Sequence, residues 1–363
     1  MLFAITLGET GGAQEHIRQL TRGLLDRGHE VGVLVQDPSD LATAARDLGA
    51  GVLPWQRITR NPNPRADLAA RHELRRAVAS FTPDVLHLHS AKAGVLGRGL
   101  LRRPEGVTIY TCHHPAYGPG RKLSHRITAR PIEQATLRWV DGIITVGARD
   151  MPMLRKLAPR VPITLIRNGV DPDGPPRSPK HPVPGALWVA RMAHPKDPLL
   201  AITVWERVVR EIPEATLSLC GTGPMARDLE RRIAASPARH RISYHGYVPD
   251  ISPYQSEASL FLLMTSIEGG ITMATLEALS QGLVPIVSDA GDAFLLAHAG
   301  CGIVTARGDD RGTAAAIVAL LRDPDRLVRM RDRALWFARE DWTAAEMVAA
   351  TEDWYVSVRD QVS

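Results

Sequence analysis

The stretch from Leu2 to Val35, LFAITLGETGGAQEHIRQLTRGLLDRGHEVGVLV, decides the fold of this chain. Its apolar start, Leu2–Thr6, predicts a strand that ends in a glycine-containing loop. Apolar residues then recur at helical spacing until Gly28, and Val31–Val35 predicts a second strand. A strand, a helix and a second strand joined in this way are typical of a parallel sheet covered by helices.

The alternation continues through residues 1–170, the first predicted domain. Residues 171–185 (DPDGPPRSPKHPVPG) contain six prolines and no apolar period, which predicts an extended linker. The alternation restarts in residues 186–340, and residues 341–363 predict a C-terminal helix that packs back on the first domain. Further strands are expected at Val85–His89, Val107–Cys112, Gly142–Val146, Ala186–Ala190, Thr216–Cys220, Ile242–His245, Leu260–Leu263, Val284–Ser288 and Gly302–Val304. We therefore expect an α/β protein with two Rossmann-like domains that face each other across a cleft.

Composition limits the class of protein. No apolar run approaches the roughly 18–20 residues of a membrane-spanning helix, and the start of the chain lacks the pattern of a secretory signal. Cys112, Cys220 and Cys301 lie far apart, which fits neither a zinc site nor a disulfide framework. We expect a cytoplasmic protein that needs no cofactor and no structural metal.

Charge is unevenly divided along the chain. Residues 1–170 hold 24 Lys and Arg against 14 Asp and Glu, whereas residues 171–363 hold 20 against 25. A basic first half suggests an anionic partner, such as a membrane surface or a phosphorylated acceptor, and an Arg-rich solvated surface is the plain alternative. Because aromatic residues are not interleaved with the basic ones, we expect no nucleic-acid partner.

Ligands of parallel sheets bind beyond the carboxyl ends of the strands, so the loops after strands are where chemistry is expected. Gly11 and Gly12 precede a helix, where the backbone can approach an anion closely. Arg191 and Lys196 share the loop after the first strand of the second domain, where both can converge on a diphosphate. Two solvated surface charges are the alternative interpretation.

A second set of polar residues follows a strand of the second domain. Glu268 precedes a glycine pair, and the free N–H groups near Ile271 and Thr272 at a helix start suit a phosphate. Glu277 lies within that helix, where its carboxylate could accept both hydroxyls of a ribose. Ordinary surface charges remain the alternative for both glutamates.

Histidines gather at two strand ends of the first domain: His87 and His89 on one, His113 and His114 on the next. No carboxylate or thiol stands at recognisable ligand spacing, so we expect no metal site. A histidine at a strand end is better placed to contact a substrate hydroxyl or to stabilise developing charge.

Taken together, these residues resemble the GT-B glycosyltransferases, and specifically the large retaining family numbered four. The resemblance covers nearly the whole chain and rests on the order and spacing of several segments. These are GGAQEH at 11–16, PDVLHLHSAKAGVLGR at 83–98, IRNGVD at 166–171, VARMAHPKDP at 189–198, LCGTGP at 219–224, HGYVPD at 245–250 and EGGITMATLEALSQGLVPIVSDAGD at 268–292.

The resemblance implies a role for each matching residue. Arg191 and Lys196 would neutralise the leaving diphosphate, and Glu268 would contact the hydroxyls of the donor sugar. His113 would lie near the reacting carbon, and these residues form the catalytic set. The implied donor-binding residues are Gly11, Gly12, Gly221, Gly246, Val248, Ile271, Thr272 and Glu277, and those on the acceptor side are Glu15, His89, Lys92 and His114. The family's chemistry retains the anomeric configuration and needs no metal, because cationic side chains stabilise the leaving group.

Two features depart from the family pattern. Eight residues separate Glu268 from Glu277, where the family usually has seven. His114 and Pro115 follow His113, where the family commonly has glycine and then an aromatic residue. The sugar side and the acceptor side are therefore the parts of the site that the resemblance predicts least well.

The expected reaction is transfer of a hexose from a nucleotide sugar, with UDP-sugar favoured, to a lipid-linked or polysaccharide acceptor. With such an acceptor we expect peripheral membrane contact through the basic first domain. Its basic residues include Arg121, Lys122, Arg126 and Arg130. The alternative acceptor is a soluble natural product such as an antibiotic scaffold. A UDP-sugar epimerase and an inactive binding homologue are the remaining alternatives, and no G-x-G-x-x-G sequence supports a dinucleotide oxidoreductase.

Overall fold

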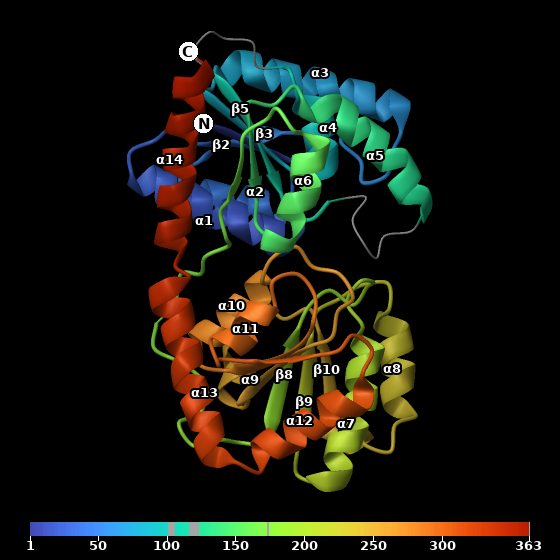
Figure 1. The fold of residues 1–363 in the computed structure, drawn as a ribbon. Helices are drawn as coiled ribbons and strands as arrows, with labels where there is room; N and C mark the ends of the chain where they lie inside the picture. The colour runs from blue at the N-terminus through green and yellow to red at the C-terminus, as the bar shows by residue number, and fades with distance from the viewer. Residues whose placement is uncertain (101–105, 116–122, 173, 363) are drawn as a thin grey trace. The chain divides into compact units, whose positions relative to one another are not determined.

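The computed structural model describes residues 1–100, 106–115, 123–172 and 174–362, with the backbone alone for residues 123–129 (Figure 1). The chain forms two compact units. Unit 1 comprises Met1–Gly169 and Ala344–Ser363, and unit 2 comprises Val170–Thr343. The basic residues Arg121 and Lys122, which we expected to face an anionic partner, lie outside the described residues.

Unit 1 is built on a seven-stranded sheet in the order β3-β2-β1-β4-β5-β6-β7, and every described pairing is parallel. Its strands are β1 (Leu2–Ile5), β2 (Gly32–Val35), β3 (Gly51–Pro54), β4 (Val85–His89), β5 (Val107–Cys112), β6 (Gly142–Thr145) and β7 (Ile163–Leu165). β1, β2, β4, β5 and β6 are buried along their whole length. Such continuous apolar runs are expected when helices cover both faces of a sheet.

Two apolar layers flank this sheet. One contains buried residues of α3 (Pro64–Phe81), α4 (Ala91–Gly97), α5 (Leu123–Leu137) and α6 (Met151–Leu157). The other contains buried residues of α1 (Gly12–Asp26), α2 (Asp40–Asp47) and α14 (Ala344–Val362). The strand order reverses between β1 and β4, which makes the carboxyl ends of these two strands the switch point of the sheet.

The C-terminal helix α14 packs back on the first domain, as predicted. Met347, Val348, Tyr355 and Val358 join the core beside α1. The Tyr355 hydroxyl lies 2.6 Å from Nδ1 of His87, which ties α14 to β4. Because α14 is acidic, unit 1 holds 25 Lys and Arg against 18 Asp and Glu, and unit 2 holds 19 against 21. The charge difference between the folded units is therefore smaller than that between the halves of the sequence.

Unit 2 repeats the architecture with a six-stranded parallel sheet in the order β10-β9-β8-β11-β12-β13. Its strands are β8 (Gly185–Val189), β9 (Thr216–Cys220), β10 (Ile242–Gly246), β11 (Leu260–Leu263), β12 (Val284–Ser288) and β13 (Ile303–Thr305). Its helices are α7 (Pro198–Glu211), α8 (Ala226–Ala234), α9 (Ser252–Ser256), α10 (Met273–Ser280), α11 (Phe294–His298), α12 (Asp310–Leu321) and α13 (Pro324–Trp336). Here the order reverses between β8 and β11.

The proline-rich stretch after residue 170 belongs to unit 2 and does not stand apart as a linker. Ser178 donates its hydroxyl to the carbonyl of Gly282 over 3.0 Å, and the Val183 N–H donates to Oγ of Ser259 over 2.8 Å. These bonds hold an extended segment against the unit, which composition alone could not predict. β3 and β7 also lack a clear strand signal, because both are short, partly exposed strands at the edges of the sheet.

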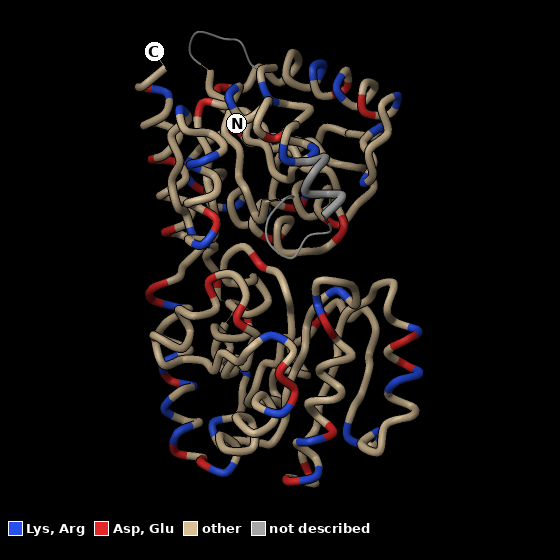
Figure 2. Tube along the Cα trace, turned by 45° about the vertical axis from the view of Figure 1, so that its right-hand side comes forward, with Lys and Arg blue, Asp and Glu red and all other residues tan. Residues whose placement is uncertain are grey.

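No helix among the described residues has the length and hydropathy to cross a bilayer. Figure 2 shows Lys and Arg interspersed with Asp and Glu on both units, with neither sign covering a whole unit.

Candidate active site

The predicted catalytic residues of unit 2 lie on loops that leave the carboxyl ends of neighbouring strands. Arg191 and Lys196 follow β8, and Glu268 follows β11, so these loops flank the switch point of the sheet. The Asp197 N–H donates to the carbonyl of Met264 over 2.9 Å, and the Ser266 N–H donates to that of Pro195 over 3.0 Å. These backbone bonds join the two loops into one rigid surface.

Lys196 and Glu268 form an ion pair across this junction. The ammonium contacts Oε1 of Glu268, and the Thr265 hydroxyl donates to the same oxygen over 2.8 Å. Both side chains are less than one fifth exposed, at 18% and 17%. Arg191 lies on the same loop with an exposed side chain. The structure therefore brings together two of the predicted catalytic residues of unit 2, and the third lies on the same loop as Lys196.

Two glycines close this loop from the β9 side. Gly221 has φ of +128°, and a Cβ there would lie 2.1 Å from the carbonyl oxygen of Ala190. A Cβ on Gly223 would lie 2.4 Å from the carbonyl oxygen of Met192. The Gly221 N–H also donates to the carbonyl of Gly246 over 2.6 Å, which links the loops after β9 and β10. Val248 packs partly buried against the core at this end. The role of Gly221 is therefore close backbone approach within the protein, and its contact with a ligand stays a prediction.

α10 begins at Met273, three residues after the glycine pair that follows Glu268. Thr272 is its N-cap and accepts from the Thr275 N–H over 3.2 Å, with its hydroxyl also 2.8 Å from that of Thr275. Glu277 is partly exposed within α10, whereas Ile271 is buried. A Cβ on Gly291, after β12, would lie 2.5 Å from the carbonyl oxygen of Gly270. The backbone of Gly291 therefore packs closely against the glycine pair in the segment that leads into α10.

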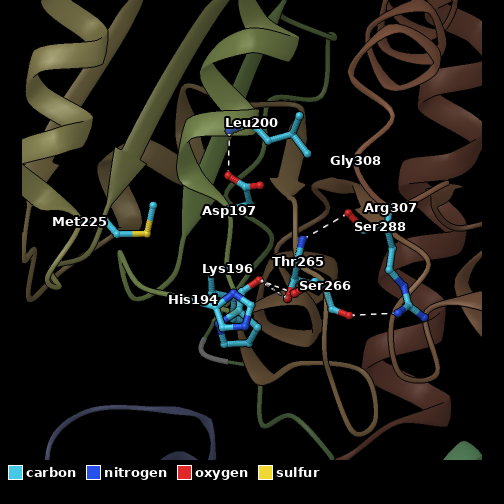
Figure 3. Close-up of a pocket in the computed structure, with 11 residues that line it drawn as sticks. His194, Lys196, Asp197, Leu200, Met225, Thr265, Ser266, Ser288, Arg307 and Gly308 are labelled. Atoms are coloured by element: carbon cyan, nitrogen blue, oxygen red, sulfur yellow. Dashed lines mark hydrogen bonds between the residues drawn. The ribbon is translucent and has the colours of Figure 1, made fainter. Parts of the chain in front are cut away.

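A pocket of about 200 Å³ opens beside Lys196 (Figure 3). Its polar lining comes from Lys196, His194, Asp197, Thr265, Ser266, Ser288 and Arg307. Arg307 is held by the carbonyls of Asp289, over 2.6 Å, and Ser266, over 3.2 Å. The sequence interpretation missed Arg307, although it follows β13 and obeys the same strand-end rule as Lys196.

In unit 1, the loop after β1 carries Gly11 and Gly12. Gly11 has φ of −179°, an extended conformation open to any residue, and Gly12 is the first residue of α1. Gly8 is the tighter position, because a Cβ there would lie 2.1 Å from Oγ of Ser39. Glu15 accepts from the guanidinium of Arg18 over 2.6 and 2.7 Å and from Gln19 over 2.9 Å. The predicted acceptor-side carboxylate is therefore already paired within α1.

Lys92 was predicted to face the acceptor, but its ammonium is already paired within the protein. Its ammonium donates to the carbonyls of Thr59 and Asn61, each over 2.7 Å, and pairs with Oδ1 of Asp67 at 2.6 Å. An ammonium has three N–H donors, and these partners occupy them. Lys92 anchors the loop before α3. Its partners there lie about thirty residues earlier in the chain, so the sequence around Lys92 does not predict this role.

Three histidines meet at the carboxyl edge of the unit 1 sheet. His16 comes from α1, His89 ends β4 and His113 follows β5. Nδ1 of His16 lies 3.1 Å from Oδ1 of Asn168, and Nδ1 of His89 lies 3.2 Å from Nε2 of His113. His89 has no exposed surface, so its predicted contact with an acceptor is corrected to a contact with His113. His87 points elsewhere, with Nε2 2.6 Å from the Thr111 hydroxyl.

Burial keeps these imidazoles neutral. Desolvation lowers the pKa of His16 to about 4, against a small rise from its hydrogen bond to Asn168. The pKa values of His89 and His113 are also well below the ordinary value, mainly through burial and then through the neighbouring histidines.

These histidines are also the described residues that could hold a metal ion, since one nitrogen from each lies within 4.8 Å of the others. Tetrahedral metal–nitrogen bonds would need about 3.3 Å between every pair of nitrogens. His89 and His113 meet that spacing, but they already hydrogen-bond each other at 3.2 Å. The absence of a metal site stays a prediction.

His114 lies next to this cluster, with Nδ1 3.6 Å from Oδ2 of Asp150. Both side chains are nearly buried, at 14% and 8% exposed. Asp150 was not among the predicted residues, although it follows β6 and thus obeys the strand-end rule. A histidine and a carboxylate stand here in place of the small glycine that the resemblance predicts.

Two family models match the chain. Residues 10–173 match "Glycosyltransferase Family 4", and residues 183–323 match "Glycosyl transferases group 1". Together they span most of both units. The chain belongs to the family 4 glycosyltransferases with the GT-B fold, as the sequence motifs indicated.

Individual relatives agree with this assignment. A phosphatidyl-myo-inositol mannosyltransferase of Mycolicibacterium smegmatis is 25% identical over 86% of this chain and 82% of its own. A UDP-Gal:α-D-GlcNAc-diphosphoundecaprenol α-1,3-galactosyltransferase of Escherichia coli is 25% identical over 64% of each chain. Among solved structures, Anabaena HepE with UDP and glucose has a TM-score of 0.82 at 17% identity, covering 98% of this chain and 99% of its own. At that identity the likeness shows the fold.

The neutral histidines predict a pH-dependent stability. The folded pKa of His16 lies near 4 and the ordinary value is 6.5, so the unfolded chain binds more protons between these values. Stability is then retained above pH 6.5 and falls as the pH drops toward 4, with His16 alone contributing a loss of about 2 kcal/mol between pH 7 and pH 5. Urea unfolding of wild type and His16→Asn at both pH values measures this, since asparagine keeps a partner for Asn168 but does not titrate.

His72→Asn is the matched control, because His72 lies exposed on α3 of the same unit and its loss should leave the pH dependence unchanged. A wild-type unfolding free energy that is equal at both pH values would contradict the assignment.

Proposed function

We propose that this protein transfers a hexose, with retention of configuration, from a UDP-sugar to a hydroxyl of a lipid-linked or polysaccharide acceptor. The observation that carries this proposal is the partly buried pair of Lys196 and Glu268 at the switch point of unit 2. It couples the residue expected to hold the diphosphate to the residue expected to hold the sugar. HepE, of the same fold, binds UDP and glucose, and the Escherichia coli relative uses UDP-Gal on a diphosphoundecaprenol-linked sugar.

The electrostatics of Lys196 suit a leaving diphosphate. Most of its surface is covered, so an anion beside it meets a cation that water screens only partly. The diphosphate gains negative charge as the bond to the sugar breaks, and a fixed cation stabilises that charge more in the transition state than in the substrate. Glu268 holds the ammonium in place until the donor arrives and then has its second oxygen available for a sugar hydroxyl.

Retention fits a site in which the leaving diphosphate accepts the acceptor's proton on the face that it leaves. The cationic side chains Lys196, Arg191 and Arg307 then supply the electrostatic stabilisation that a divalent ion supplies in other transferases. We propose that the reaction needs no metal.

Replacing Lys196 should abolish most of the activity. With a panel of UDP-glucose, UDP-galactose, UDP-N-acetylglucosamine and GDP-mannose, wild type should release nucleotide slowly from one of them. Lys196→Ala should lower that rate at least ~100-fold, the scale for losing one group that stabilises transition-state charge. Lys180→Ala, which removes an exposed lysine of the same unit, should have no effect. A Lys196→Ala enzyme with near-normal turnover would sink the diphosphate assignment.

Metal removal tests the second part of the mechanism. Dialysis against EDTA should leave the rate of sugar transfer unchanged within about twofold, because the charge-stabilising groups are covalent parts of the chain. Activity that disappears with EDTA and returns with Mn²⁺ or Mg²⁺ would show that the cationic side chains are insufficient.

The outer helices of unit 1 favour a lipid-linked acceptor over a soluble one. α4 packs between α3 and α5. Leu68 on α3 is 62% exposed, and Ile132 on α5 and Trp139 in the turn after it are each 49% exposed. Exposed arginines lie on the same elements: Arg65, Arg71, Arg75 and Arg76 on α3, Arg130 on α5 and Arg138 in the turn after it. Apolar side chains among cations are suited to an interface with anionic lipid.

Sedimentation with vesicles tests this surface. The protein should bind vesicles containing phosphatidylglycerol, bind less as salt rises, and not bind pure phosphatidylcholine. Arg75→Ser/Arg76→Ser should weaken binding about thirtyfold, from roughly 1 kcal/mol for each of the two basic residues. Arg227→Ser/Arg231→Ser, which removes two exposed arginines of unit 2, is the matched control. Failure to bind anionic vesicles would favour a soluble natural product as acceptor.

A further inference from the structure

The contact between His89 and His113 determines which hydrogen-bonding group His113 can offer to a ligand. Nδ1 of His89 faces Nε2 of His113 at 3.2 Å, and the two rings stack with 28° between their planes. Nε2 of His89 is buried without a hydrogen-bond partner in the described residues. His113 is partly exposed and makes no second hydrogen bond within the described chain.

A neutral imidazole carries one N–H group and one lone pair, so the pair has two arrangements. In the first, His89 donates from Nδ1 to Nε2 of His113, and the buried Nε2 of His89 is a bare lone pair. In the second, His113 donates from Nε2, and the buried Nε2 of His89 becomes an N–H donor without an acceptor. Orphaned buried N–H groups are rarer than under-satisfied acceptors, because a donor buried without a partner loses its full bond to water. The first arrangement is therefore the stable one.

We propose that His89 is a positioning residue that holds His113 as the Nδ1–H tautomer, so that His113 presents a hydrogen-bond donor to the substrate and not a lone pair. The proposal rests on the proposed function in one respect, namely that His113 lies near the reacting carbon. In this tautomer Nδ1 of His113 cannot remove a proton from the acceptor. It donates to an oxygen of the substrate, and proton removal falls to the leaving diphosphate.

The surrounding structure fixes the place of His89. The next residue, Ser90, has φ of +79° and ψ of 148°, a strained region that non-glycine residues rarely adopt. Its hydroxyl lies 2.7 Å from that of Thr6. The edge-on ring of His16, at 4.9 Å and 85°, packs against His113 from the other side. A strained backbone persists where surrounding contacts hold it in place. Here the strained residue is Ser90, which directly follows His89, the residue that orients His113.

Nitrogen-15 NMR of the wild-type protein tests the tautomer directly and needs no activity. Long-range ¹H–¹⁵N spectra of the histidine-labelled protein at pH 7, assigned by loss of signals in His113→Asn, should show His113 protonated at Nδ1 and unprotonated at Nε2. A signal from the Nε2–H tautomer, or from the doubly protonated ring, would overturn the proposal. The spectrum reports the tautomer whether or not the protein transfers a sugar. Failure of this proposal can therefore be distinguished from failure of the proposed function.

Kinetics test the consequence. His89→Asn retains an amide donor near the position of Nδ1, whereas His89→Leu removes it. We expect His89→Leu to lower kcat about tenfold or more with little change in donor KM, since the lost interaction acts in the transition state, and His89→Asn to recover most of the loss. His87→Leu is the control: it is an equally buried histidine of the same strand, but it contacts Thr111 and Tyr355.

Equal losses of kcat in the two leucine variants, or no recovery in His89→Asn, would reduce His89 to an ordinary core residue and overturn the proposal. If His89→Leu does not fold, the wild-type spectrum and His89→Asn still decide the matter.

Discussion

Parallel pairing is the constraint on which both candidate sites depend. Because every described strand pair is parallel, all strands of a sheet end at the same edge, and the loops after them become neighbours. Where the strand order reverses, the adjacent loops turn to opposite faces, and polar side chains gather between them. In unit 1 this point separates β1 from β4, where His16 and His89 meet. In unit 2 it separates β8 from β11, where Lys196 meets Glu268.

The two edges solve the problem of buried polarity in different ways. Unit 2 retains full charges, and pairing Lys196 with Glu268 compensates for their partial loss of water. Unit 1 removes charge altogether, because burial depresses the pKa of its clustered histidines until they are neutral. A neutral cluster can supply directed hydrogen bonds without repelling a cationic transition state. A charged pair can exchange partners with an incoming diphosphate.

Several glycines of the unit 2 motifs are explained by close packing within the protein and do not require contact with a ligand. Gly221 and Gly223 allow the loop after β9 to contact the backbone of the loop after β8. Gly291 allows the loop after β12 to contact the carbonyl of Gly270, in the segment that leads into α10. These close approaches hold in place the loop that carries Lys196 and the segment that leads from Glu268 into α10. By contrast, Gly11 adopts an extended conformation that any residue could take, and a Cβ there would lie 2.8 Å from Oε1 of Gln14.

The sequence by itself determined the two Rossmann-like units, the return of α14 and the strand ends at which chemistry collects, because periodicity and strand-end position are local properties. Lys196 and Glu268 followed from those rules. Only the tertiary structure decided which strand-end residues meet and which are already occupied. Lys92 is bound by Thr59, Asn61 and Asp67, His89 faces His113, and the proline-rich segment lies against unit 2. Each of these outcomes depends on groups far away in the chain, and neither apolar period nor residue type records which distant groups will fill a side chain's hydrogen bonds.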